Sequence, residues 1–268
     1  MLIGPLILAL ALAWPPQEAG KTDADAPPLT ENEYVYVAQN LKEEFFIQRE
    51  NARGLCLGRI PLKGDPPTRI RPGQAGTILL AGWSEAKEID RLGKTLFRFP
   101  LKGLPWEYAS DMQKLPGGNY LILIHTMLEA DRPVRGGGHR AELIPSSTVL
   151  EVDSKGQVIR RLKNELKDKA RAWTVWPIGK DRLLVTSALG VSEVDWDGNE
   201  HFLYPLPGAA VPHDAMPRPN GDFMVAFSGP KGGVVERTRS GEEVWKIRHD
   251  CAISIQELPG GNILAGGG

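Results

Sequence analysis

The chain repeats one pattern of apolar and polar positions several times. A short segment ends in a turn sequence and a run of apolar residues follows it, as in SDMQKLPGGNYLILI (110–124), HDAMPRPNGDFMVAFS (213–228) and ISIQELPGGNILAG (253–266). A second element, Glu-x-x-x-x-Gly, follows each of four apolar runs, and its glycine recurs at steps of 63, 42 and 43 residues. A unit of about 42 residues is therefore repeated, and one copy carries an insertion of roughly 20 residues.

Each unit contains four short extended pieces separated by turn sequences. Four antiparallel strands in a repeat of this length are typical of a β-propeller blade, because one small twisted sheet cannot bury both of its faces and must stack on its neighbours. The Gly-Asn and Asp-x-x-Gly sequences supply the positive backbone dihedrals and the side-chain to backbone hydrogen bonds of tight hairpins. The sequence predicts an all-β fold, a β-propeller of four-stranded antiparallel blades.

The two ends of the repeat array are less regular. ENEYVYVAQ, EEFFIQREN and LCLGRIPL predict the last three strands of a blade, and CAISIQELP with GNILAGGG predicts the first two strands of another. We expect about five blades plus a partial one, in an incomplete ring that is either truncated or closed in an unusual way. The predicted boundaries are 1–30 for a signal peptide with a flexible spacer and 31–268 for the propeller domain.

The N-terminal segment predicts export. An apolar run ends in Ala11-Leu12-Ala13, which fits the apolar region and small-residue cleavage site of a signal peptide. It is short for a membrane span, so we expect no stable span after its removal and a periplasmic or secreted protein. The segment before the run has no Lys or Arg, which leaves an N-terminal anchor or a misplaced start codon as alternatives.

Composition narrows the function classes. The formal net charge of -1 argues against a nucleic-acid binder, which normally has a large basic excess. Cys56 and Cys251 match no metal-ligand spacing, and we expect two free, buried thiols, one at the outer edge of a blade and one near an inner strand. We predict neither a metal nor another cofactor.

The insertion at 125–147 is the first candidate site. We expect a loop between the second and third strands of its blade, on the same face of the propeller as the His213-Asp214 pair and the connection 161–172. Arginines recognise sulfate, phosphate or carboxylate groups through paired hydrogen bonds, which favours an anion site. In the alternative interpretation the loop is simply solvated, with Glu129, Asp131 and Glu142 offsetting its positive charge. The predicted ligand-binding residues are Arg132, Arg135, His139 and Arg140.

His213 and Asp214 form the second candidate site. At the start of an inner strand they would line the central channel, where a neutral histidine can act as nucleophile or general base, with Asp214 or another carboxylate setting its tautomer. The alternative is that Asp214 caps the turn and His213 is partly exposed. The aligned pairs Ser110-Asp111 and 253–254 retain the aspartate once and the histidine never, which favours a structural role for the aspartate.

The phrase His-Asp-x-x-x-x-Pro-Asn-Gly-Asp (213–222), with the Glu-Val-Asp-x-x-Gly hairpins and the tryptophan of EEVWKI, resembles the arylsulfotransferase-type and quinoprotein-like β-propellers over 66–268. The resemblance implies that His213 carries a sulfuryl group while nearby arginines neutralise its oxygens. The chain departs from the family in lacking an N-terminal β-sandwich and the Ala-x-Asp-x-x-Thr-Gly-x-x-x-Trp docking pattern, so no pyrroloquinoline cofactor is expected.

Together these features favour an exported binding scaffold for a small anionic ligand or a protein partner. An arylsulfotransferase-like enzyme is the alternative, and a purely structural repeat protein is a third.

Overall fold

The computed structural model describes residues 33–267, apart from the gaps at 40–44, 52–54, 63–65, 102, 104–107, 134–138, 164–171, 206–209, 230–231 and 258–262. The predicted signal peptide and spacer lie outside the described residues.

The described chain forms small antiparallel sheets, each built from consecutive strands. The first has three strands, β1 (Glu33–Gln39), β2 (Phe45–Asn51) and β3 (Cys56–Pro61). Four sheets of four strands follow, and their strands are β4 (Arg69–Pro72), β5 (Ile78–Ala81), β6 (Glu85–Ile89) and β7 (Thr95–Pro100); β8 (Tyr108–Lys114), β9 (Tyr120–Pro133), β10 (His139–Val152) and β11 (Val158–Arg161); β12 (Ala172–Ile178), β13 (Arg182–Ser187), β14 (Gly190–Asp195) and β15 (Glu200–Tyr204); β16 (Val211–Pro217), β17 (Phe223–Ser228), β18 (Gly233–Arg237) and β19 (Glu243–Arg248). The last has two strands, β20 (Ala252–Glu257) and β21 (Ile263–Gly267).

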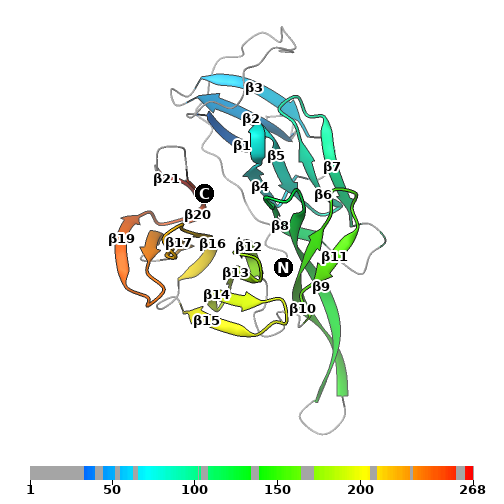
Figure 1. The fold of residues 1–268 in the computed structure, drawn as a ribbon, viewed down its shortest axis with the longest axis vertical. Helices are drawn as coiled ribbons and strands as arrows, with labels where there is room; N and C mark the ends of the chain where they lie inside the picture. The colour runs from blue at the N-terminus through cyan, green and yellow to red at the C-terminus, as the bar shows by residue number, and fades with distance from the viewer. Residues whose placement is uncertain are drawn as a thin grey trace.

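This arrangement confirms the predicted fold class. The sheets are the blades of a β-propeller and stand around a common centre (Figure 1). The only helical turn in the described residues is η1 (Gln74–Gly76), a 3-10 turn in the β4–β5 hairpin. The three-stranded and two-stranded sheets at the ends also agree with the sequence pattern. Within the described residues no strand pairing joins β20–β21 to β1–β3.

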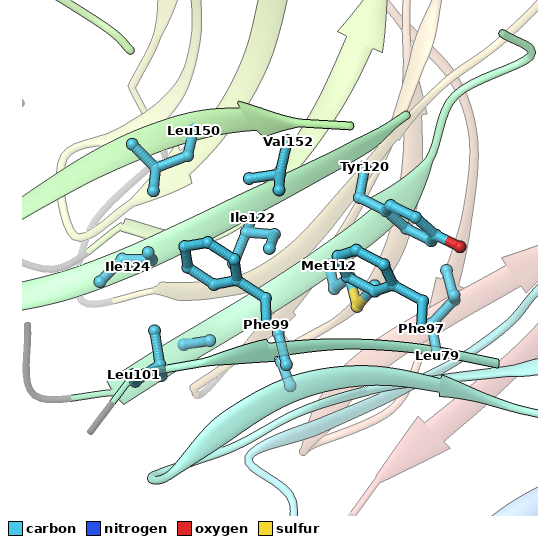
Figure 2. Packing of buried hydrophobic residues seen from close by; sticks show 13 residues of the cluster. Leu79, Phe97, Phe99, Leu101, Met112, Tyr120, Ile122, Ile124, Leu150 and Val152 are labelled. Atoms are coloured by element: carbon cyan, nitrogen blue, oxygen red, sulfur yellow. The ribbon is translucent and has the colours of Figure 1, made fainter. Parts of the chain in front are cut away.

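In the four-stranded blades the apolar runs form the second strand, and both faces of these runs are buried. In β9, Ile122 and Ile124 pack toward the preceding blade, whereas Leu121 and Leu123 pack toward the following one. Figure 2 shows the first of these interfaces, where Phe97 of β7 stacks on Tyr120 with ring centroids 3.8 Å apart. Because alternate residues of a strand point to opposite faces, an unbroken apolar run is what two neighbours require.

The turn sequences behave as predicted. Asp153 Oδ1 accepts hydrogen bonds from the backbone N–H groups of Lys155 and Gln157, both at 2.8 Å, and Gly156 has φ 83°. The same pattern surrounds Asp90 and Asp195. These turns fix the hairpin between the third and fourth strands.

The first strands of the blades line the centre. β8 contacts β4 and β12, and β16 contacts β12 and β20. The fourth strands lie at the outside (Figure 1). Since the first strands all run in one direction, their N-terminal ends and the connections between second and third strands share one face, which we call the hairpin face. Their C-terminal ends and the tight first hairpins share the other, which we call the turn face.

The insertion is not a loop, which corrects the prediction. β9 and β10 continue to pair beyond the rest of their blade, from Val152 opposite Tyr120 to His139 opposite Pro133. The resulting two-stranded arm projects away from the disc (Figure 1). The Gly-Gly-Gly sequence at 136–138 favours a loop, but the strand pairing of the blade continues through the residues on either side of it.

Both cysteines are free, as predicted, but neither is fully buried. Cys56 is exposed at the start of the outer strand β3, and Cys251 is partly exposed just before the inner strand β20. The expectation of two buried thiols was wrong because Cys56 lies on a strand with no neighbour on its outer side.

Candidate functional site

Four of the first strands contain the same irregularity. The pairing of β8, β12, β16 and β20 with their second strands skips one residue, and the skipped residues are Ser110, Trp173, His213 and Ile253. A bulge of this kind leaves one residue outside the ladder and changes the direction of its side chain. The alignment of His213 with Ser110 and residue 253 is therefore confirmed by the strand register.

In β8 and β16 the residue after the bulge is an aspartate of a buried ion-pair network. Arg71 of β4 donates from Nε to Asp111 Oδ1 at 2.7 Å and from Nη2 to Asp214 Oδ1 at 2.9 Å. Arg69 Nη1 lies 3.5 Å from Asp214 Oδ2. Both carboxylates have no exposed surface. Two guanidinium groups thus face two carboxylates, and the network has no net charge.

Each aspartate also accepts a hydrogen bond from the first strand of the following blade. The backbone N–H of Val175 in β12 donates to Asp111 Oδ2 at 2.9 Å, and that of Ile255 in β20 donates to Asp214 Oδ2 at 3.1 Å. Asp214 therefore caps no turn; it joins its own blade to the first strand of the next. This explains why the aspartate recurs between blades while the histidine does not.

The pKa of the Arg71 guanidinium lies above its ordinary value. Burial alone lowers this pKa, but the charges and hydrogen bonds of Asp111 and Asp214 outweigh burial. All four carboxylate oxygens of Asp111 and Asp214 have donors within the protein. The ion-pair network, which has no net charge, therefore fills the centre of the disc.

His213 lies on the hairpin-face side of this ion-pair network and is partly buried. Its Nε2 is 2.8 Å from Ser228 Oγ, and its backbone carbonyl accepts a hydrogen bond from Arg69 Nη2 at 3.2 Å. Burial, followed by the positive charge of Arg69, lowers the pKa of His213, and Asp214 only partly opposes them. The imidazole is therefore neutral at neutral pH. Its hydrogen-bonded partner among the described residues is Ser228 rather than Asp214.

The structure does not bring the two candidate sites together. Arg132 and Arg140 lie directly opposite each other on the arm, and His139 lies opposite Pro133. Arg135 falls outside the described residues. The arm ends far from β16, which carries His213 (Figure 1). The arm that carries Arg132 and Arg140 and the strand that carries His213 therefore lie in separate parts of the molecule.

The register of the arm also determines which positions share a face of the ribbon. Directly opposite residues share one face of a ribbon, and residues of alternate parity share the other. Glu142 lies on the face of Arg132 and Arg140, opposite Ala130. The other face carries the remaining acidic positions of the insertion, Glu129 and Asp131.

Sequence reasoning missed the arginines of the network. Arg69 and Arg71 alternate on the first strand of the first complete blade. The position of Arg71 is uncharged in the other blades, whereas that of Arg69 is occupied by Asp111 in β8 and by Asp214 in β16. Two charges at inward positions of an inner strand were the available signal, since a buried arginine requires carboxylates nearby.

No known protein family matches the chain, and no curated protein matches it significantly. Among solved structures, a protein of unknown function from Bacteroides caccae is 21% identical, with 85% of this chain and 77% of that one covered and a TM-score of 0.57. A streptogramin B lyase is 10% identical, with 88% and 95% covered and a TM-score of 0.52. At these identities the likeness extends to the propeller fold alone. Neither is described as a sulfotransferase, so the arylsulfotransferase resemblance gains no support beyond the architecture.

No helix in the described part of the chain is long and apolar enough to span a membrane. The described residues also contain no group of three or more metal-binding side chains.

Proposed function

We propose that this protein is an exported binding scaffold that takes up an anionic group on the β9–β10 arm. The observation that carries the proposal is the register that sets Arg132 directly opposite Arg140. The arm lies beyond the blade, so a ligand or partner can approach it without disturbing the core. His139, the first residue of β10, and Arg135, which lies outside the described residues, complete the predicted site.

Two like charges opposite each other on an antiparallel ribbon destabilise it unless an anion lies between them. A sulfate, phosphate or carboxylate removes that repulsion and accepts hydrogen bonds from both guanidinium groups. The register places two of the three acidic residues of the insertion on the other face, so they do not neutralise this pair directly. The anionic group can belong to a small molecule or to a partner protein.

The experiment is a sulfate titration of the ¹⁵N-labelled protein against chloride at constant ionic strength. We expect saturable shifts confined to the arm, and we expect the double variant Arg132→Gln, Arg140→Gln to lose them while retaining its fold. Arg248→Gln, an exposed arginine of β19, is the matched control and retains the wild-type response. Shifts that persist in the double variant would remove the arm as the site.

Export rests on the sequence of the first thirteen residues. Expression of the full chain in a bacterial host, followed by N-terminal sequencing of the periplasmic or secreted product, tests it. A product that begins at Met1 and stays with the cells contradicts export.

Sulfuryl transfer through His213 is the second candidate. The observation that favours it is the neutral, partly buried imidazole, which has the protonation state of a nucleophile. An assay with an aryl sulfate donor and a phenolic acceptor decides the matter, since turnover that disappears in His213→Ala requires an enzyme. The separation of His213 from the arm arginines favours the binding scaffold instead.

A further inference from the structure

A cavity of about 250 Å³ opens at the centre of the disc on the turn face, opposite the face of His213. Residues from five sheets line it. Five of the lining residues are equivalent, because each lies at the same distance from the centre of the hairpin between the first and second strands of its sheet. They are Arg71, Gln113, Trp176, Met216 and Gln256. One position of the repeat thus supplies a ring of five side chains of four types.

Two members of this ring carry hydrogen-bond donors without a partner. Gln113 is 7% exposed, and its Nε2 makes no hydrogen bond. The indole Nε1 of the half-buried Trp176 is likewise buried and unpaired. A buried donor without an acceptor is costly, so natural structures normally pair it with protein, water or ligand. Both residues line the same cavity, so an acceptor bound there from outside the chain can satisfy these donors.

Each charged residue that lines the cavity is already paired with a group of opposite charge. Arg71 is held by Asp111 and Asp214 beneath the cavity and lies 4.7 Å from the centroid of the Trp176 ring. Lys114 Nζ is 2.8 Å from Glu88 Oε2, and Glu257 Oε1 is 2.5 Å from Arg218 Nη1. An ionised ligand would bring a charge that no unpaired group of the lining offsets.

Apolar side chains supply the remaining contacts. Leu79, Met216 and Ile255 border the cavity together with the Trp176 ring. Methionine adapts to the shape of an aromatic group and makes favourable sulfur contacts with it. The volume lies below the range of about 300–1,000 Å³ typical of pockets for drug-sized ligands, so the occupant is small.

We propose that this axial cavity is a binding site for a small uncharged molecule that joins a planar apolar ring to a carbonyl group. The carbonyl oxygen accepts hydrogen bonds from Gln113 Nε2 and Trp176 Nε1, and the ring lies against Met216 and Ile255. The site is independent of the arm and of its anion, and it lies on the other face of the disc from His213.

Benzamide is the probe, with benzoate as its charged counterpart and toluene as the ring without an acceptor. Binding is followed through the ¹⁵N–¹H resonance of the Trp176 indole, which is assigned by its loss in Trp176→Phe. We expect benzamide to shift this resonance saturably and to bind at least ten-fold more tightly than benzoate or toluene. Tighter binding of benzoate would overturn the assignment of an uncharged ligand, and no saturable shift with benzamide would overturn the site.

Two variants test the geometry. Gln113→Leu removes one donor at nearly constant volume and should weaken benzamide at least ten-fold, whereas Gln157→Leu, an exposed glutamine in a turn, should leave binding unchanged. Met216→Trp fills the cavity and should abolish the shift. Circular dichroism confirms the fold of each variant, and a folded Gln113→Leu protein with undiminished affinity contradicts the proposal even if Met216→Trp does not fold.

Discussion

The guanidinium group of Arg71 and the carboxylate of Asp214 meet across the centre of the propeller, with Nη2 and Oδ1 2.9 Å apart. The two residues are 143 positions apart in the chain and belong to the first and fourth of the four-stranded blades. The contact therefore forms only when the intervening blades are in place. It links the ends of the complete part of the repeat array and makes their stability cooperative.

Replacing Asp214 by Asn should destabilise the protein strongly. The substitution leaves Arg71 and Arg69 facing only one buried carboxylate, and loss of one partner of a buried ion pair costs about 3 kcal/mol. Urea unfolding followed by circular dichroism measures the change. Asp181→Asn is the control, because the Asp181 side chain is 85% exposed and its surface pair with Arg160 should contribute less than about 0.5 kcal/mol. Equal midpoints for the two variants would contradict a structural role for the network.

The fold could be predicted from the sequence because each repeat contains short sequence patterns that determine local structure. The apolar run at 120–124, the Asp-x-x-Gly turn at 153–156 and the step of about 42 residues each report on short-range structure. The arm was missed for the same reason. Its glycines and proline are local turn signals, whereas its pairing depends on register established by the blade below it.

Glu88, the acidic residue of the first Glu-x-x-x-x-Gly element, should make stability depend on pH. Burial raises the pKa of Glu88, but hydrogen bonds from Lys114, Thr77 and Tyr120 outweigh it and the pKa lies below its ordinary value. The carboxylate thus stabilises the fold above its unfolded pKa of about 4.3, and this contribution is lost as pH falls through the folded value.

The Glu88→Gln variant should accordingly lose about 2 kcal/mol of unfolding free energy at pH 7, and the difference from wild type should shrink below about pH 4. Denaturant unfolding at a series of pH values gives both quantities. The exposed Glu242→Gln serves as the control. A difference that is the same at pH 3 and pH 7 would show that Glu88 contributes through packing instead of charge.

The candidate sites were less accessible to sequence reasoning than the fold. His213 and Asp214 were identified from a motif, but their partners, Ser228 and Arg71, come from other strands and one of them from another blade. Gln113 and Trp176 gave no motif at all, because their shared position becomes visible only when the hairpin registers of different blades are aligned. Such constellations are properties of tertiary structure.

The imidazole of His213 should titrate below its ordinary pKa of about 6.5. Burial and the charge of Arg69 both disfavour the protonated form. Since the unfolded chain then binds a proton more readily than the folded one, stability should fall as pH drops below about 6.5. An NMR titration of the His213 ring protons, assigned through His213→Gln, measures the midpoint. A midpoint at or above 6.5 contradicts the lowered pKa, and a pH slope of stability that survives in His213→Gln assigns it to other groups.

Removal of the arm should separate binding from folding. Replacing 127–145 by Asn-Gly joins Thr126 to Ser146 through a two-residue turn of the kind that suits a β-hairpin. His125 and Ser147, whose Nδ1 and Oγ are 3.0 Å apart, remain in place, and the buried residues of the blade lie below them. The unfolding free energy should therefore change by less than about 1 kcal/mol, while the sulfate response of the arm disappears. Benzamide binding at the axial cavity should persist, because none of the residues that line it is removed. A shortened protein that fails to fold would show that the arm belongs to the core, and one that still responds to sulfate would place the anion site elsewhere on the disc.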